Sequence, residues 1–322
     1  MLAFAVRRFG AAILVLFAIS VLVFLIFFAT PGVDPAARIA GRNADPATLV
    51  QVRHSFGLDR PLPIRYALMM RHLFISRDLE SFVNRGAKVV PQIIQAAPIT
   101  LSLVLGAALI WMLFAVVMGT VAARLRGTLV DPLIMLAGVV GISLPVYWLG
   151  EMVNLITQNR LHDSLFSWVP PLGYVGLTDN PGQWALHLLF PWLTLAVLYA
   201  GIYARVLRAE LVANLSEDYV RTARAKGISE RRILIRHALR CSLIPIVSLF
   251  GLDVGALVGG AALLTEVVFG LPGVGKLTYD ALQNVDLPMI MATVLYAAFF
   301  VVLANAAVDV LYAQLDPRAR HA

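Results

Sequence analysis

The stretch GLPGVGKL, residues 270–277, is the strongest candidate for nucleotide chemistry in this sequence. It nearly fits the phosphate-binding loop G-x-x-x-x-G-K-[ST], in which backbone amides and the lysine hold phosphates. Leu277 stands where a hydroxyl is needed for magnesium, and residues 243–266 before it are typical of an apolar helix rather than a strand. The sequence therefore argues against nucleotide binding here, and if the protein uses ATP, a partner must hold it.

Other patterns of catalytic or metal-binding residues are missing from the sequence. The six histidines are scattered without the spacing of a ligand pair, and no G-x-S-x-G nucleophile motif occurs. The single cysteine, Cys241, excludes a disulfide or a cysteine-built metal site within the chain. We predict no catalytic residues, no metal site and no cofactor bound by this chain.

Carboxylates in apolar surroundings are the remaining candidates for chemistry. Glu151, Asp253, Glu266 and Asp309 lie in or near apolar segments. A charge at the centre of a bilayer costs about 2.5–3.5 kcal/mol on insertion scales, so each carboxylate is a candidate functional group. Three of them lie near segment ends, where hydration is easy. Only Asp253 is expected deep inside a segment, which gives an ion-coupled carrier weak support.

The composition places these residues in an integral membrane protein. The 322 residues are 60% hydrophobic and 14% charged, and the mean hydropathy is +0.81. These values are outside the range of soluble domains. The net charge of +7 says little about nucleic acid until the charges are placed relative to a bilayer.

Six segments are long enough to span a bilayer, which needs roughly 20 mainly apolar residues. They are residues 9–29, 99–123, 132–156, 184–206, 243–266 and 289–312. With the N-terminus in the cytoplasm, the short outer loops hold only Arg160 and Lys276, as the positive-inside rule requires. The sequence thus predicts an all-α membrane protein with six transmembrane helices and both termini in the cytoplasm.

This topology divides the chain into four parts. They are an N-terminal transmembrane helix (1–30), an extracytoplasmic helical segment (31–98), a five-helix core with a cytoplasmic loop at 207–242 (99–312) and a cytoplasmic tail (313–322). Within the extracytoplasmic segment we expect a helix at 46–56, with Asp45 as its N-cap and Pro46 in its first position.

Proline and glycine mark a possible translocation path through the spans. Pro145 and Pro191 interrupt two spans, and such breaks need neighbouring helices or a wet cavity. Three glycines recur at four-residue spacing in residues 251–259, which indicates either packing within the chain or a dimer seam or pore lining. The candidate path residues are Pro145, Asp253, Gly255 and Gly259.

The cytoplasmic loop contains a polar stretch, EDYVRTARAKGISERRILIRHALR, at residues 217–240. Ser216 is expected to cap a helix that runs to Lys226, and Gly227 can adopt the left-handed conformation that ends it. Ser229 is then expected to cap a second helix. The stretch could be a solvated loop or a docking element for a cytoplasmic partner, and the residues favour these two equally. A DNA-binding helix pair is disfavoured, because membrane helices at both ends leave little room to approach a groove.

The same stretch continues as DYVRTARAKGISERRILIRHALRCSLIP and resembles the cytoplasmic loop of inner-membrane permeases of ATP-binding-cassette importers, in the peptide/nickel group. Similar stretches are PITLSLVLGAALI (98–110), GISLPVYWLG (141–150), TEVVFGLPGVGKL (265–277), VDLPMI (285–290) and NAAVDVLYAQLDPRAR (305–320). One stretch, RDLESF at 77–82, departs from the G-D-L-G-x-S of that group, which leaves the local outer-loop geometry open.

The resemblance implies a type I importer permease in the bacterial inner membrane. Its partners would be a homologous second permease, two cytoplasmic ATP-binding subunits that hold ATP and Mg²⁺, and an extracytoplasmic solute-binding protein. The substrate would be a di- or oligopeptide, with nickel or another small solute as the alternative cargo. From a different class of protein, an ion-coupled secondary carrier remains an alternative.

The resemblance also implies where the ATP-binding subunit docks. The general motif E-A-A-x-x-x-G aligns with Arg221, Thr222, Ala223 and Gly227. Ala223 would permit close contact with the ATPase, and Gly227 would let the loop turn tightly. The implied docking residues are Asp218, Tyr219, Arg221, Thr222, Ala223, Ala225, Lys226 and Gly227.

Overall fold

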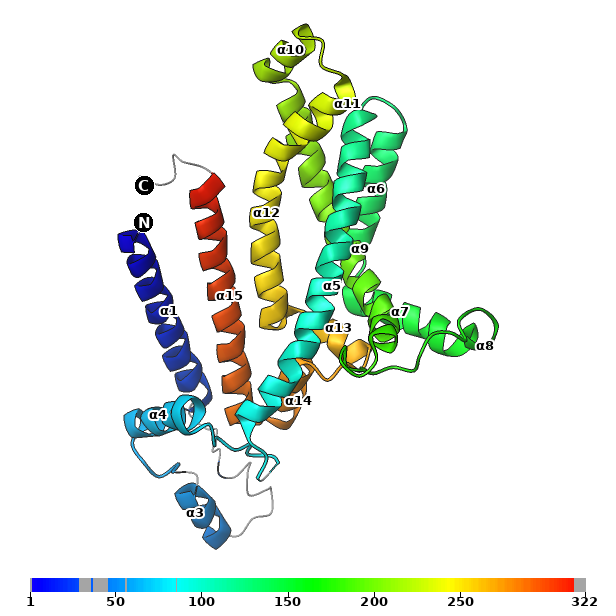
Figure 1. Cartoon of the computed structure of the whole chain (residues 1–322). Helices are drawn as coiled ribbons and strands as arrows, with labels where there is room; N and C mark the ends of the chain where they lie inside the picture. The colour runs from blue at the N-terminus through cyan, green and yellow to red at the C-terminus, as the bar shows by residue number, and fades with distance from the viewer. Residues whose placement is uncertain (1, 29–35, 37–45, 56, 85, 316–322) are drawn as a thin grey trace.

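The computed structural model describes residues 2–28, 36, 46–55, 57–84 and 86–315, and within these ranges the chain forms helices and no strands. This is the all-α class that the sequence predicts. Long helices run beside one another, and short helices gather at both ends of the molecule (Figure 1). The first helix begins and the last helix ends at the same end of the molecule.

Five helical segments are long and apolar enough to cross a membrane: 10–27, 89–124, 181–215, 230–261 and 287–308. The segments coincide wholly or in part with α1 (Leu2–Phe28), α5 (Val89–Arg124), α9 (Pro181–Leu215), α12 (Leu239–Ala256) and α15 (Leu287–Leu315). Five of the six predicted spans therefore fall on long helices. Local signals set some of their ends: the Asn180 side chain accepts a hydrogen bond from the Gln183 amide, and Pro181 begins α9.

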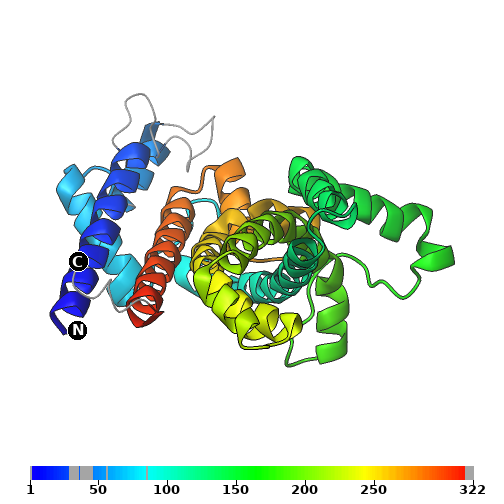
Figure 2. The same cartoon turned by 90° about the horizontal axis from the view of Figure 1, so that it is seen from above.

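The sixth predicted span, 132–156, is broken. Helices α6 (Val130–Ser143) and α7 (Val146–Asn154) meet at an angle of 90° beside Pro145. Proline cannot supply a backbone amide to a continuing helix, which explains the break. The pair makes a sixth span only if both halves belong to one bent crossing. Beyond α7, η2 (Leu155–Arg160) leads to α8 (His162–Leu165), which lies on the opposite side of the molecule from α1 (Figure 2).

The largest hydrophobic core lies between α5 and α9. Trp111 of α5 and Tyr203 of α9 are fully buried in it. Helix α6 packs against α9 where two glycines meet, because a Cβ added to Gly138 would lie only 3.2 Å from the Cα of Gly201. Small residues of this kind let membrane helices approach closely. Helices α5, α6 and α9 therefore form one closely packed unit.

A second core joins α1 and α15 to the segment between the first two spans. Phe24 of α1 and Met291 of α15 pack with Leu73 of η1 (Arg71–Ser76). The same segment contains α3 (Pro46–Ser55) and α4 (Leu62–Met70). The helix predicted at 46–56 is confirmed and ends at Ser55, whereas its expected cap Asp45 lies outside the described residues.

The RDLESF stretch is fixed by the residue just before α15. The Ser81 hydroxyl donates a hydrogen bond to Asp286, and the Phe82 amide donates to Asp286 Oδ1 at 3.1 Å. Asp286 is buried. The stretch that departs from the family pattern is therefore anchored to the start of the last span.

The helix predicted to reach residue 266 ends at Ala261. Here η4 (Leu257–Ala261) contains Gly260 with φ 122°, a conformation that L side chains rarely adopt. The chain then turns into two short helices, α13 (Leu263–Val268) and α14 (Val274–Asn284). These helices pack against each other and lie beside the lower parts of α5 and α15 (Figure 1).

Candidate functional site

Helix α10 (Asp218–Ala225) is the element that positions most of the expected docking residues. It lies beyond the ends of α9 and α12, at the end of the molecule where α1 begins and α15 ends (Figure 1). The chain returns to α12 through α11 (Glu230–Arg232) and η3 (Ile233–Ala238). The predicted arrangement of helix, glycine turn and helix is confirmed.

The start of α10 differs from the prediction. Glu217, with extended backbone at φ −71° and ψ 153°, precedes the first helical residue. Ser216 was expected to cap this helix, but its hydroxyl donates to the Ala213 carbonyl oxygen at 2.6 Å and so closes the end of α9. A serine between two helices can cap the end of the first or the start of the second. Here α9 ends at Leu215, directly before Ser216, so the serine caps α9. Ser229 precedes α11, but its side chain makes no capping bond.

The end of α10 is the one predicted from Lys226 and Gly227. Gly227 has φ 75°, its amide donates to the Arg224 carbonyl at 2.9 Å, and the Ile228 amide donates to the Ala223 carbonyl at 3.2 Å. This pair of bonds is the Schellman motif, in which a left-handed residue satisfies the last carbonyls of a helix. The glycine turn therefore fixes the direction in which the chain leaves α10.

One face of α10 packs on the chain itself. Val220 is fully buried and Ala223 is 8% exposed, and both contact Ile233 of η3. Leu215 and Ile228 complete this small core. The small side chain of Ala223 lets α10 pack closely against η3, and the expectation that Ala223 also permits close contact with an ATPase stays a prediction.

The other face of α10 is exposed and carries the remaining docking candidates. Tyr219 is 41% exposed, and its hydroxyl lies 3.4 Å from Asn214 Oδ1. The Thr222 hydroxyl donates to the Asp218 carbonyl at 2.9 Å. The exposed candidates are Asp218, Tyr219, Arg221, Thr222, Ala225, Lys226 and Gly227, and we call this set the α10 outer face.

An ion pair closes the glycine turn, and sequence reasoning missed it. Arg224 donates from Nε to Glu230 Oε1 at 2.7 Å and from a terminal nitrogen to Oε2 at 3.2 Å. The bond to Glu230 raises the pKa of the Arg224 guanidinium above its ordinary value. A two-bond contact of this kind fixes orientation as well as distance, so it holds α10 and α11 together across Gly227. The opposite charges six residues apart were the only signal for it.

The loop is tied to the membrane helices by a hydrogen bond at its base. The Asn214 side-chain amide, near the end of α9, donates to Ser242 Oγ of α12 at 3.0 Å. Ser242 is fully buried and donates to the Ala238 carbonyl. The ends of α9 and α12 are therefore joined directly beneath α10.

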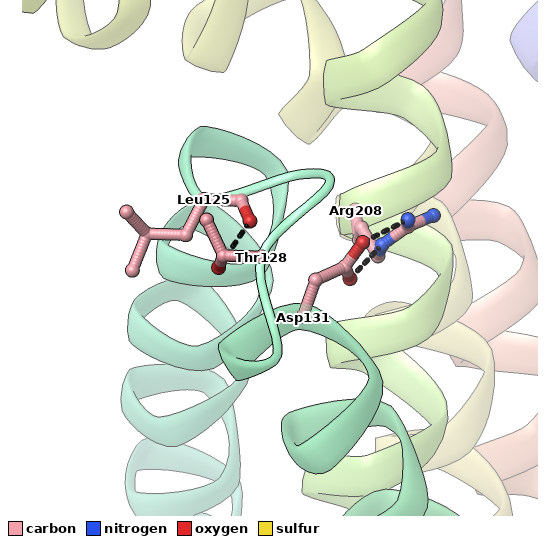
Figure 3. Close-up of polar contacts among 4 residues, drawn as sticks. All are labelled: Leu125, Thr128, Asp131 and Arg208. Carbon is pink, nitrogen blue, oxygen red and sulfur yellow. Dashed lines mark hydrogen bonds and ion pairs between the residues drawn. The ribbon is translucent and has the colours of Figure 1, made fainter.

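A second ion pair joins α9 to α6, and it also was not predicted. Arg208 donates from Nε to Asp131 Oδ1 and from a terminal nitrogen to Oδ2, both at 2.5 Å (Figure 3). Asp131 side-chain exposure is only 9%. Nearby, the Thr128 hydroxyl donates to the Leu125 carbonyl in the turn between α5 and α6. The ion pair fixes the start of α6 against the part of α9 that leads to α10.

The candidate path residues lie in different environments. Pro145 sits at the 90° break between α6 and α7. Gly255 and Gly259 of the α12–η4 segment face α15, where a Cβ on Gly255 would overlap Ala304 and one on Gly259 would lie 3.0 Å from the Ala297 carbonyl oxygen. These glycines thus serve packing within the chain, the first of the two uses that the sequence left open. That they also line a path stays a prediction.

Asp253 is bonded to a neighbouring span. The Tyr203 hydroxyl of α9 donates to Asp253 Oδ2 at 2.6 Å. Tyr203 is fully buried, whereas Asp253 is partly exposed. The expectation that Asp253 lies within a span is confirmed by its place in the helical segment 230–261.

Glu266 does not behave as a carboxylate at a hydrated span end. Its side chain is fully buried; Thr100 donates to Oε1 at 2.6 Å and the Lys276 amide donates to Oε2 at 2.9 Å. A Cβ added at Gly273 would overlap the Glu266 carboxylate. The glycine-rich stretch that resembles a phosphate-binding loop thus turns a backbone amide to a carboxylate of the same chain. The expectation for Glu266 is wrong because α13 folds it under that stretch.

Glu151 and Asp309 are the other two carboxylates that were predicted near span ends. Glu151 is exposed on α7, as expected for a carboxylate near a span end, and the side chain of Asp309 lies outside the described part. Among the described residues, no three His, Cys, Asp or Glu side chains are grouped to hold a metal ion.

Comparisons of the sequence with known proteins identify its family. Residues 115–321 match the family described as binding-protein-dependent transport system inner membrane component, and residues 1–104 match the N-terminal family of such components. A protein of Brucella abortus (strain 2308), provisionally named a peptide transport system permease protein, is 35% identical over 321 residues, covering 100% of both chains.

Two further relatives match over their whole length. A di/tripeptide transport system permease protein of Pseudomonas aeruginosa (strain UCBPP-PA14) is 36% identical, covering 100% of this chain and 99% of the relative. A glutathione transport system permease protein of Salmonella paratyphi A (strain ATCC 9150 / SARB42) is 37% identical, covering 100% of both.

Proposed function

Because the chain belongs to the family of inner membrane components of binding-protein-dependent transport systems, we propose that it is the permease subunit of an ATP-driven importer for di- or oligopeptides. It forms half of the translocation path together with a homologous second permease. An extracytoplasmic binding protein delivers the peptide, and two cytoplasmic ATPase subunits bind ATP and Mg²⁺. This chain contributes transport and docking surfaces, and the chemistry of ATP hydrolysis belongs to the partners.

The names of the relatives support a peptide as the cargo. The three relatives described above are named for peptide, di/tripeptide and glutathione transport, and they match the whole chain. These names favour a peptide over nickel or another small solute. The length and side-chain preference of the peptide depend on the binding protein as well as on the path.

The α10 outer face is the observation that carries the docking proposal. One side of α10 is buried against Ile233, so the helix is held in a fixed orientation, while its opposite side is exposed beyond the membrane spans. An amphipathic helix whose polar side is free fits a groove on another protein. In this proposal the end of the molecule that carries α10 faces the cytoplasm.

The contacts beneath α10 suggest how ATPase movement reaches the path. A push on α10 passes through Val220 to Ile233 and η3, which continues into α12. The bond from Asn214 to Ser242 makes α9 follow α12. The ion pair between Arg208 and Asp131 makes α6, with the bend at Pro145, move together with α9. Closure of the ATPases would thus move several spans together, because packed helices shift as units.

Transport in proteoliposomes tests this function. The chain is purified with its partner subunits, reconstituted, and supplied outside with binding protein and labelled dialanine, and inside with ATP and Mg²⁺. We expect peptide uptake that requires ATP hydrolysis and persists when ionophores abolish ion gradients. Uptake that stops with the ionophores and continues without ATP would identify an ion-coupled carrier instead.

A further inference from the structure

Asp253 is a carboxylate inside a membrane-spanning helix. It takes no part in the contacts that link α10 to the spans. It lies about 15 Å along the helix axis from Leu243, at 1.5 Å rise per residue. Ionisable groups at such depth are costly, are usually paired, and commonly mark substrate or ion pathways. We therefore expect Asp253 to be paired with a cation or with hydrogen-bond donors.

The described part of the chain provides a hydrogen-bond donor for only one oxygen of Asp253. The Tyr203 hydroxyl satisfies Asp253 Oδ2 at 2.6 Å. No Lys or Arg side chain in the described ranges pairs with Asp253, and within those ranges its Oδ1 accepts no hydrogen bond. A carboxylate offers about four lone-pair sites. Tyr203 thus orients the group without neutralising its charge.

The carboxylate faces away from the seam with α15. Gly255, two residues along, packs against Ala304 of that helix. Residues two apart in a helix point about 200° from each other, so Asp253 lies on the far side of α12. There it stands between buried Leu257 and exposed Leu252, and it is itself partly exposed. This side of α12 packs on α9, and the partial exposure of Asp253 shows that the carboxylate is not completely covered there.

Aromatic residues neighbour Tyr203 and Asp253 on both helices. Tyr199 lies one turn before Tyr203 on α9, and Phe250 lies one turn before Asp253 on α12, so each pair shares a helix face. The rings of Trp111 and Tyr199 stack with centroids 4.7 Å apart, and those of Trp111 and Phe250 are 5.7 Å apart. A carboxylate beside aromatic rings attracts an ammonium group both by charge and by cation–π interaction.

We propose that Asp253 binds the α-ammonium group of the peptide during its passage, with Tyr203 as a positioning residue and the rings of Tyr199 and Phe250 beside the cation. The ammonium group has three donors, which match the free oxygen and lone pairs of the carboxylate. This inference rests on the proposed function, because the α-ammonium group belongs to a peptide substrate. It adds a binding site within the membrane to the site on the binding protein.

The test uses the complete reconstituted transporter and labelled dialanine at saturating binding protein. Asp253→Asn removes the charge and retains the shape, and we expect it to lower the maximal uptake rate about tenfold while subunit assembly persists. Asp253→Glu keeps the charge and is expected to recover most of the lost uptake. Glu151→Gln, which removes an exposed carboxylate from α7, is the matched control and is expected to leave uptake unchanged.

A comparison with N-acetyl-dialanine tests the ammonium group itself. Each peptide is used at the concentration that saturates the binding protein, as titration of that protein establishes. The wild-type transporter is expected to prefer the free peptide, and Asp253→Asn is expected to reduce this preference about tenfold. A preference that is unchanged by Asp253→Asn overturns the proposal.

Tyr203→Phe separates a binding site from a merely structural bond. It removes the hydroxyl that holds Asp253 but leaves the charge, so uptake is expected to fall less than in Asp253→Asn. Equal losses of uptake and of thermal stability in both variants would show a structural bond and overturn the proposal. Wild-type transporter without ATP-dependent dialanine uptake would instead refute the proposed function, whereas active wild type with equally active Asp253→Asn refutes only this inference.

Discussion

Arg208 of α9 donates to both carboxylate oxygens of Asp131 at the start of α6, so the ion pair joins two helices that are 77 residues apart in the sequence at this point. Arg208 is seven residues before Leu215, where α9 ends beneath α10. A two-bond contact between planar groups transmits rotation as well as translation. The pair is therefore well placed to make α6 follow α9 when the cytoplasmic loop moves.

Breaking this pair is predicted to impair transport and stability together. Asp131→Asn leaves Arg208 without an opposite charge in a place where Asp131 is nearly buried, and an unpaired charge of this kind is destabilising. We expect a lower melting temperature and slower uptake in proteoliposomes. For the melting temperature the control is Asp218→Asn, because the Asp218–Arg221 pair is exposed and exposed pairs contribute little stability. Equal melting temperatures for wild type and Asp131→Asn would contradict the prediction.

Gly227 is predicted to tolerate no side chain without cost. Its φ of 75° is left-handed, where an L residue costs about 1–2 kcal/mol. Gly227→Ala should lower the free energy of unfolding by that amount and weaken co-purification of the ATPase. Gly10→Ala serves as the control, because Gly10 lies in α1 with open space around it. A Gly227→Ala protein that binds the ATPase as wild type does would show that this turn is not needed for docking.

Ala223 and Ala225 are predicted to differ although both lie on α10. Ala223→Leu inserts volume into the contact with Ile233, and overpacking costs about 1–3 kcal/mol. Its melting temperature and its ATPase binding should both fall. Ala225→Leu changes the exposed α10 outer face, so the melting temperature should stay while ATPase co-purification falls. If Ala225→Leu leaves ATPase binding intact, this part of the outer face does not dock.

Glu266 is predicted to hold α13, α14 and α5 together. Glu266→Gln places an amide where the carboxylate accepts from both Thr100 and the Lys276 amide, and leaving one buried donor unsatisfied costs about 1–3 kcal/mol. The melting temperature of the complex should fall, and the exposed Glu151→Gln should not change it. Equal stability of the two variants would show that the network around Glu266 is dispensable.

Local sequence signals predicted α10 well but not what packs beneath it. The charge of Lys226 and the left-handed tendency of Gly227 act within a few residues, so the end of the helix could be predicted. The prediction for Ser216 failed because the length of α9 decides which helix this serine caps. That length depends on packing. The burial of Ala223 follows from contact with Ile233, which no local pattern indicates.

The features that the sequence did not predict are mainly contacts between residues far apart in the chain. Thr100 and Glu266 are 166 residues apart, and Asp131 and Arg208 are 77 apart. Each residue alone is an ordinary polar group near the end of an apolar segment, and only the folded chain brings them together. Pro145 did predict a break, but the 90° angle there depends on how α6 and α7 pack. The glycines of α12 could not be assigned to α15 or to a pore from spacing alone.

Site-directed cross-linking from the α10 outer face tests the docking of the ATPase most directly. In a Cys241→Ser background, Ala225→Cys carries a cleavable cross-linker in membranes that contain all subunits, and Leu129→Cys, exposed in the turn between α5 and α6, is the control. We predict that Ala225→Cys forms an adduct with the ATPase subunit, in a yield that changes with ATP, and that Leu129→Cys forms far less. No adduct from Ala225→Cys, or equal yields at both positions, would contradict docking through α10.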